Sequence, residues 1–277
     1  MNKNQVFNDT VEQIQHDATR QMLALIHGIF IVADGKKVNN PNVLTEQINE
    51  DSIHRNFEKI KNKFIHNYEV FPIFDFIFNG IERLNLLFMN AQGFFRHKEE
   101  YVLEIKKISV TDLLLDVIDF YSGISAVQNI DIYTEFSDTP HILADYGLLF
   151  RAFCNIIDNA IKYSYSKDSA DRKRYIYVTC RRHSQMGHII IEVSSYGVKL
   201  EDDELLNYKM FQYGVRGVYA SDRDRHGSGI GLAEVKRIIN SHGGNVDIFF
   251  SKKEGEPGGV TVLKVVLPPE SGIRKKE

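Results

Sequence analysis

Two apolar stripes with helical spacing occupy the first hundred residues. Residues 11–29 place an apolar side chain at every third or fourth position, and residues 77–95 repeat this pattern. Such stripes pack helices side by side at shallow angles, so we predict a helical hairpin. Two hairpins bury more apolar surface as a four-helix bundle, and we therefore expect a homodimer. The alternative is that the hairpin packs on the rest of its own chain. The stripes consist of Val11, Ile14, Ala18, Met22, Leu25 and Ile29, then of Ile77, Ile81, Leu84, Phe88, Ala91 and Phe95.

The segment between the stripes is longer than a minimal hairpin needs. A turn-rich loop over residues 35–42 precedes a charged stretch over residues 44–68 that is typical of a helix. Pro72 then starts or kinks the next helix. Two interpretations stay open: an input or partner-docking element, or a longer helix with a kink.

Residues 148–164 form a third helical stripe, which carries polar side chains. Asn155 and Asn159 lie four residues apart and share one helical face, while Asp158 and Lys162 share a neighbouring face. Asparagine is a poor helix-interior residue because its side chain competes with the backbone for hydrogen bonds. Either the two are satisfied core amides, or their carbonyl oxygens bind Mg²⁺ beside a nucleotide, with Lys162 near the phosphates.

A glycine-rich turn precedes the last predicted helix. Residues 226–232 read HGSGIGL and run directly into an amphipathic helix over residues 233–240. Glycine lets the backbone approach an anion closely, and a helix N-terminus offers free N–H groups and partial positive charge. We therefore predict a phosphate-binding turn. Its spacing is not that of a dinucleotide fingerprint, and the Lys-Ser/Thr of a P-loop is absent.

Taken in order, these segments resemble the ATP-binding domain of sensor histidine kinases, in the class that includes gyrase-type topoisomerases and heat-shock chaperones. NIIDNAIKYS at residues 155–164 resembles the N box, and HGSGIGLAEVKRIINSHGG at residues 226–244 resembles the second glycine box with its helix. MFQYGVRG at residues 210–217 resembles the phenylalanine box of the ATP lid. The resemblance covers residues from about 105 to 270.

The flanking segments fit the same resemblance. Residues 108–117 resemble the entry helix, residues 131–136 a strand, and residues 258–268 the final strand, while Asp145 precedes the N-box helix. The implied fold is α+β. A helical dimerisation and histidine phosphotransfer domain over residues 1–104, with a dimeric four-helix bundle, precedes an α/β sandwich ATP-binding domain over residues 105–277.

One position departs from the family pattern. The first glycine box reads Asp-x-Gly-x-Gly, and its Asp accepts a hydrogen bond from the adenine amino group, whereas residues 195–199 read SYGVK and keep only Gly197. Because charge-assisted hydrogen bonds are about twice as strong as neutral ones, Ser195 predicts weaker adenine affinity, softer selectivity or a water bridge. The alternative is that Ser195 is a turn residue and nucleotide binding has decayed. The intact N box and second glycine box favour binding.

The resemblance also implies the ligands and their contacts. ATP and Mg²⁺ are expected, with Asn159 and Asn155 on the metal, Lys162 and Tyr163 near phosphates or ribose, and a mobile lid over residues 203–225. The implied contact residues are Asn155, Asn159, Lys162, Tyr163, Ser195, Gly197, Phe211, Arg216, Gly227, Ser228, Gly229, Ile230, Gly231, Leu232 and Thr261.

His16 is the predicted phosphoacceptor. It points away from the first apolar stripe, and Asp17 beside it can accept a proton from the imidazole. Residues 16–22 resemble the H box, although Gln21 replaces the usual proline and Arg20 lies one place late. A plain surface histidine is the alternative. The rival histidines, none of them followed by an acid, are His27, His54, His66 and His97.

Composition narrows the classes of function. The net charge of the 277 residues is −3, so bulk charge suggests no direct nucleic-acid partner. Cys154 and Cys180 lack metal-ligand spacing. The longest apolar run, residues 22–33, is well short of the roughly 20 residues of a membrane span, and the N-terminus lacks a signal-peptide pattern. We therefore expect a cytoplasmic protein.

Three functions stay open. The leading one is an ATP-dependent protein histidine kinase that phosphorylates His16 and passes the phosphoryl group to an aspartate of a response-regulator receiver domain. The second is a non-catalytic regulator that acts as a phosphotransfer or docking scaffold. The third is an ATPase of the same superfamily without phosphohistidine, such as a protein serine kinase. Because only 15 residues precede His16, we expect input from a partner, from residues 35–70 or from sequence outside this chain.

Overall fold

The chain divides into two units, Met1–Phe95 and Arg96–Glu277. The computed structural model describes residues 100–165, 174–219, 229–252, 255 and 258–269, all of them in the second unit. The predicted helical hairpin, the homodimer and the pair of His16 and Asp17 lie outside the described residues. The boundary expected at residue 104 stays a prediction.

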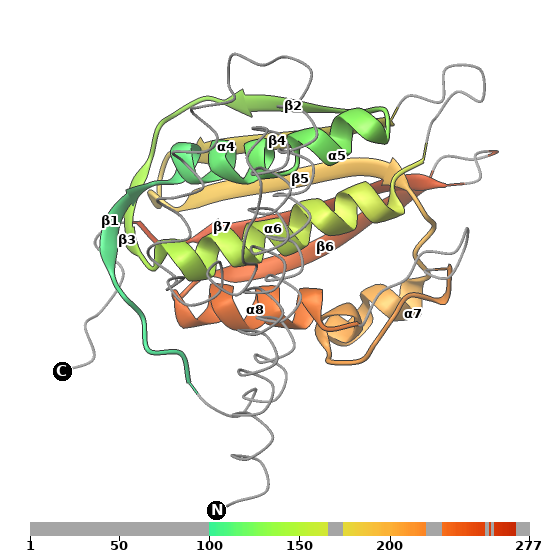
Figure 1. Ribbon diagram of the computed structural model, residues 1–277. Coiled ribbons are helices and arrows are strands. Elements are labelled where there is room, and N and C mark those ends of the chain that lie inside the picture. Colours follow the sequence, from blue (N-terminus) through green and yellow to red (C-terminus); the bar gives the residue numbers. More distant parts are fainter. Residues whose placement is uncertain (1–99, 166–173, 220–228, 253–254, 256–257, 270–277) are drawn as a thin grey trace, which may run out of the picture. The chain divides into compact units, whose positions relative to one another are not determined.

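A five-stranded mixed sheet in the order β2-β4-β5-β7-β6 forms the centre of the second unit (Figure 1). β2 pairs with β4 in parallel, and the other neighbours are antiparallel. A separate two-stranded sheet pairs β1 with β3. The strands are β1 Lys106–Ser109, β2 Ile130–Phe136, β3 His141–Ala144, β4 Arg174–Arg182, β5 Ile189–Gly197, β6 Asn245–Lys252 and β7 Gly259–Leu267.

Helices α4, α6 and α8 cover one face of this sheet (Figure 1). Alternate residues of β4 and β5 face these helices and are buried, among them Val178 and Ile191, because side chains of a strand point to opposite faces in turn. Phe153 of α6 is completely buried in the same core. The helices are α4 Val110–Phe120, α5 Ser122–Val127, α6 Tyr146–Tyr163, α7 Asp202–Leu205 and α8 Gly231–Ser241, with a 3-10 helix η2 over Leu206–Phe211.

The opposite face of the sheet carries aromatic side chains. Tyr133 of β2 and Tyr177 of β4 are cross-strand partners whose ring centroids lie 5.4 Å apart, and both rings are about half exposed. Phe249 of β6 lies on the same face and is exposed as well. Stacked cross-strand aromatic pairs stabilise the sheet even on a solvated face.

The structure confirms the predicted α/β sandwich and most of its elements. The helix expected over residues 148–164 is α6, capped by Asp145, whose side chain accepts from the Leu148 backbone N–H at 3.0 Å. The helix expected over residues 233–240 is α8, and the strands expected near residues 131–136 and 258–267 are β2 and β7.

The start of the entry helix was predicted wrongly. Ile108 and Ser109 belong to β1, where Ile108 pairs with Ile142, and the helix begins only at Val110. The physical reason is a cap: the Ser109 side chain accepts a hydrogen bond from the Asp112 backbone N–H at 3.3 Å, which fixes the first turn at that point.

Both cysteines are buried and carry free thiols, Cys154 in α6 and Cys180 in β4. Burial raises the pKa of the Cys180 thiol to about 12. Within the described residues, no three His, Cys, Asp or Glu side chains are grouped as a metal site. No helix in the same part of the chain combines the length and apolar character that crossing a bilayer requires.

Candidate functional site

Asn155 of α6 faces the first residue of α8. A Cβ atom placed on Gly231 would lie 3.3 Å from Asn155 Oδ1, so glycine lets α8 begin directly against this amide. Asn155 is buried, and Asn159, one turn further along the same face of α6, is half-buried. Two amide side chains therefore run from the start of α8 toward the C-terminal end of α6.

Lys162 forms an ion pair with Asp158 one helical turn earlier, on the helical face that the sequence predicted the two residues to share. Both side chains are largely buried along α6, with exposed fractions of 31% and 15%. The ammonium group of Lys162 is therefore held at the same end of α6 as Asn159.

The N-terminus of α8 begins directly after the glycine turn. Its cap residue is Ile230, and among the described residues no side chain caps this helix. The first N–H groups of a helix have no acceptor within the helix, so those of Gly231 and Leu232 are available to an anion. Gly227 and Ser228 lie outside the described residues.

Gly229 joins this turn to the lid. Its φ of 70° is in the left-handed region, and the Gly214 backbone N–H donates to its carbonyl at 3.0 Å. A Cβ on Gly229 would lie 2.8 Å from the Val215 carbonyl oxygen, so no other residue fits without displacement. The glycine turn and the lid therefore touch backbone to backbone.

Ser195 and Thr261 are cross-strand partners on β5 and β7. Ser195 is buried and lies on the same face of β5 as Val193 and Ile191, the face that the helices cover. Thr261 is half-buried. Their hydroxyl groups therefore belong to the side of the sheet that also carries α6 and α8.

Gly197 ends β5 in direct contact with the end of α6. A Cβ at this position would lie 2.0 Å from the Tyr163 carbonyl oxygen, which accepts from the Val198 backbone N–H at 3.0 Å. The Tyr165 backbone N–H in turn donates to the Tyr196 carbonyl at 2.7 Å. The glycine that the family pattern shares with this chain is thus required here for packing between α6 and β5.

The lid is anchored to α8 through aromatic rings. Phe211 is buried, and the ammonium of Lys236 lies 3.6 Å from the ring centroid of Tyr208 and 5.5 Å from that of Phe211. These are cation–π distances. Arg216, the other lid residue predicted for the site, is exposed.

Glu204 fixes the fold of the lid itself. Its buried carboxylate accepts from the backbone N–H of Glu201 at 2.7 Å and from that of Val218. It therefore ties the start of α7 to a segment fourteen residues later. The part of the predicted lid that the structure describes, residues 203–219, is held at both ends.

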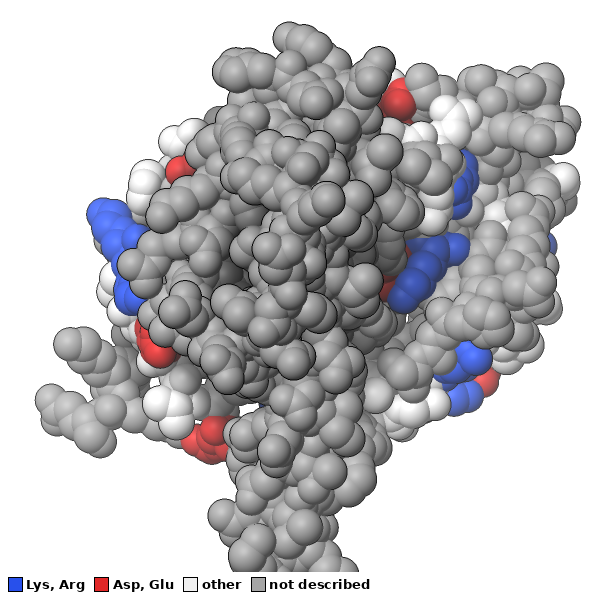
Figure 2. Space-filling view, in the orientation of Figure 1, with Lys and Arg blue, Asp and Glu red and all other residues white. Residues whose placement is uncertain are grey.

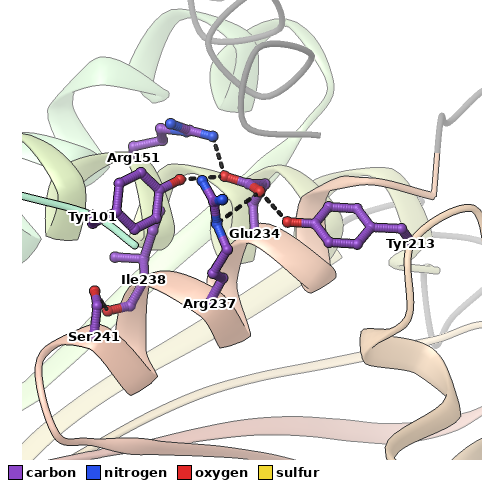
Figure 3. A network of polar contacts seen from close by, with 7 residues as sticks. All are labelled: Tyr101, Arg151, Tyr213, Glu234, Arg237, Ile238 and Ser241. Carbon is purple, nitrogen blue, oxygen red and sulfur yellow. Dashed lines mark hydrogen bonds and ion pairs between the residues drawn. The ribbon is translucent and has the colours of Figure 1, made fainter. Parts of the chain in front are cut away.

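A second buried carboxylate, Glu234 of α8, was not anticipated from the sequence. It is completely buried and forms an ion pair with Arg151 of α6, which is 5% exposed (Figure 3). Tyr101 donates to its Oε2 at 2.6 Å, and Tyr213 of the lid donates to its Oε1. Arg237 Nε lies 3.4 Å from Oε1.

Burial shifts the acidity of both phenols in this network. It raises the pKa of Tyr101 and of Tyr213, and the hydrogen bonds to Glu234 act in the same direction. Both hydroxyls therefore stay protonated near neutral pH and act as donors. The available sequence signal was Arg151 within the apolar stretch LLFRAF and Glu234 within the amphipathic stretch LAEVKRII.

On the face seen in Figure 2, the described Lys and Arg side chains lie in small separate groups among acidic and uncharged residues.

Comparison with known proteins supports the ATP-binding assignment. Residues 144–271 match the family described as histidine kinase-, DNA gyrase B-, and HSP90-like ATPase. The sensor-like histidine kinase SenX3 of Mycolicibacterium smegmatis is 25% identical over 182 residues, which cover 64% of this chain and 44% of the relative. The sensor histidine kinase HprS of Escherichia coli is 28% identical over 193 residues, which cover 68% and 37%. The chain thus spans less than half the length of these relatives.

A solved structure with a TM-score above 0.5 has a similar fold. Full-length ShkA, crystallised with AMPPNP, superposes with a TM-score of 0.55 at 19% identity, covering 94% of this chain and 45% of that one. The mycobacterial sensor histidine kinase MprB gives a TM-score of 0.48 at 22% identity, covering 59% of this chain and 97% of that one.

Proposed function

We propose that the chain is an ATP-dependent protein histidine kinase, because residues 144–271 match the family described as histidine kinase-, DNA gyrase B-, and HSP90-like ATPase. It transfers the γ-phosphoryl group of ATP to His16. It then passes this group to an aspartate on a response-regulator receiver domain, as part of a two-component system. Relatives named sensor histidine kinases, aligned over about two thirds of the chain, support this proposal.

One arrangement supports the proposal: an amide of α6 lies against the N-terminus of α8, which no side chain of the described residues caps, and the preceding glycine turn contacts the lid segment. Asn155 lies next to Gly231 at the start of α8, and Gly229 contacts the lid backbone. A helix N-terminus with free N–H groups binds phosphate, and a lid that touches this turn can close over a bound nucleotide.

The amide oxygens of Asn155 and Asn159 suit Mg²⁺ beside bound ATP. Magnesium prefers hard oxygen ligands and keeps several waters, so Asn159 and Asn155 would supply amide oxygens while ATP supplies the rest. When bound, the ion neutralises phosphate charge during transfer. Lys162, near the same end of α6, would add positive charge, and Tyr163, Phe211 and Arg216 would contact the nucleotide.

The remaining contacts would surround the base and the phosphates. The hydroxyls of Ser195 and Thr261, partners across β5 and β7, would face the adenine. Because Ser195 is neutral, its hydrogen bond to the adenine amino group is weaker than that of a carboxylate. We therefore expect weaker ATP binding than an aspartate at this position would give.

At the acceptor, a ring nitrogen of His16 would attack the γ-phosphorus in line with the departing ADP. The P–O bond to ADP breaks as the N–P bond forms, and the proton of the attacking imidazole goes to Asp17. A homodimer of the helical region would bring the acceptor histidine near an ATP-binding unit, within one chain or between two.

The experiment is phosphorylation of the purified full chain with γ-labelled ATP and Mg²⁺, beside His16→Ala and Asn159→Ala variants. We expect a label that is stable to alkali and lost in acid, present in the parent protein and absent from both variants. A label that persists in His16→Ala would show that the phosphoacceptor is a residue other than His16.

Ser195 favours one second candidate, a regulator that binds nucleotide weakly, does not phosphorylate itself and acts as a phosphotransfer or docking scaffold. If the parent protein takes no label, titration of ATP against the parent and Ser195→Asp proteins separates the two. Binding without labelling supports the regulator. Absence of binding in both proteins would contradict either function.

A further inference from the structure

We propose that Glu234 is a positioning residue that couples the lid to the segment before β1, because both segments donate a hydroxyl to this one buried carboxylate. The consequence for nucleotide binding rests on the proposed function. The coupling itself is a property of the protein without nucleotide.

Tyr101 and Tyr213 come from distant parts of the chain, and both hydroxyls donate to the side chain of Glu234 (Figure 3). Tyr101, in the segment before β1, donates to Oε2 of Glu234 at 2.6 Å across 133 residues of sequence. Tyr213, in the lid, donates to Oε1. The carboxylate lies on α8, three residues after the helix begins.

Arg237 adds a second connection between Tyr101 and the carboxylate of Glu234. Its guanidinium lies 3.9 Å from the centroid of the Tyr101 ring, while its Nε lies 3.4 Å from the Glu234 oxygen that Tyr213 contacts. Displacement of Tyr101 therefore has two effects. Oε2 of Glu234 loses a hydrogen bond, and Arg237, which lies beside Oε1, loses the ring on which it stacks.

Burial makes the orientation of this shared acceptor depend on its protein contacts. Glu234 is inaccessible to solvent, so water does not replace a donor that leaves. Hydrogen bonds to a charged group in a low dielectric are strong. Loss of the Tyr101 hydroxyl leaves Oε2 held by Arg151 alone, so the carboxylate shifts toward Arg151 and the position of Oε1, which Tyr213 contacts, changes with it.

Each tyrosine is linked to a feature of the candidate site. Tyr213 precedes Gly214, whose backbone N–H donates to Gly229 in the glycine turn. At the other end, the Glu104 backbone N–H donates to the Asp145 cap of α6 at 2.9 Å, so the segment of Tyr101 is held at two points. A change before β1 can thus reach the turn at the start of α8.

The test is hydrogen exchange of the full chain without nucleotide, comparing the parent with Tyr101→Phe. Removal of this hydroxyl leaves the ring over Arg237. We expect exchange at the Gly214 and Val215 amides to rise about tenfold, although neither residue touches Tyr101, while β4 keeps its protection. In the reverse experiment, Tyr213→Phe is expected to raise exchange near Glu104.

The matched control is Tyr177→Phe, which removes a hydroxyl from the exposed face of the sheet and should leave lid exchange unchanged. A Tyr101→Phe protein with altered exchange only around residue 101 would overturn the proposal. So would an equal rise in β4 and β5, because that pattern reports general destabilisation.

Titration of ATP against the same proteins tests the proposed function separately. A rise in lid exchange combined with ATP affinity weakened several-fold supports both inferences. If Tyr101→Phe raises lid exchange but the parent protein binds no ATP, the coupling is supported and the kinase function is contradicted.

Discussion

Gly197 shows how one residue can be required by packing at a position where the family pattern suggests ligand binding. Its Cα lies so close to the Tyr163 carbonyl that a methyl group would overlap it at 2.0 Å, and the atom it would meet is backbone. Backbone cannot turn aside as a flexible side chain can. Gly197→Ala is therefore expected to lower the free energy of unfolding by about 1–3 kcal/mol, or more. Urea denaturation followed by circular dichroism measures this.

The control for this substitution has the opposite expected sign. Gly147 lies exposed in the first turn of α6, and a Cβ there would meet only Asp145 Oδ1 at an ordinary 3.6 Å. Because alanine favours the helix, Gly147→Ala should raise stability by about 0.5–1 kcal/mol. Equal losses from both substitutions would refute the packing explanation for Gly197.

Individual residues were predictable where a motif or spacing marks them. The shared helical face of Asp158 and Lys162 followed from their separation by four, and the structure adds the ion pair between them. Glu234 was missed because helical periodicity identifies core positions by apolar side chains, and a buried charge reads as a solvent-facing one. Its ion-pair partner Arg151 lies 83 residues away in sequence, and sequence spacing does not reveal such a pair.

At the scale of elements, the ion pair of Arg151 and Glu234 joins α6 to α8. Removal of one partner leaves the other charge buried, so Glu234→Ile is expected to cost about 3–5 kcal/mol of unfolding free energy. The double variant Arg151→Met with Glu234→Ile should recover most of this loss, because apolar residues can replace a buried pair. Chemical denaturation of the three proteins measures both effects.

An exposed ion pair provides the comparison. Arg182 Nε lies 3.1 Å from Asp138 Oδ2, with both side chains about 40% exposed. Solvent screens such pairs, so Asp138→Asn should change stability little.

The double variant also provides the contradicting outcome for the buried pair. If Arg151→Met with Glu234→Ile is no more stable than Glu234→Ile alone, the loss comes from the tyrosine contacts of Glu234 and not from an unpaired Arg151.

Long elements were predicted better than short ones. α6 and α8 show the helical period over three turns or more, and their predicted ends were within two residues of the observed ones. β1 has four residues, too few to show an alternation, and it was merged with α4. The pairing of β1 with β3 is a long-range contact that local pattern does not contain.

At the scale of the whole unit, His242 makes folding sensitive to acid. Its Nδ1 donates to the Ile238 carbonyl at 2.8 Å, and its Nε2 accepts from the Asp145 backbone N–H at 3.1 Å, so the neutral ring links the end of α8 to the start of α6. Burial lowers its pKa below the usual 6.5, against weaker opposing effects of Ile238 and Asp145.

The sign of the pH effect follows from this lowered pKa. The unfolded chain takes up a proton on His242 near pH 6.5, whereas the folded unit takes it up only at lower pH. This stabilisation is therefore complete above pH 6.5 and is lost as the pH falls toward the folded-state pKa, by at most about 1.4 kcal/mol per pH unit. Thermal unfolding between pH 5 and 8 should show less acid sensitivity in His242→Gln than in the parent. Equal slopes would exclude His242 as the source.

The two buried cysteines have a practical consequence for spectroscopy. The chain contains no tryptophan and only Cys154 and Cys180, both enclosed, and alkylating reagents attack the thiolate form. A cysteine introduced at Val218, which is 66% exposed, would react before either native thiol. One dye attached there would give an optical reporter of lid position in the otherwise unmodified protein.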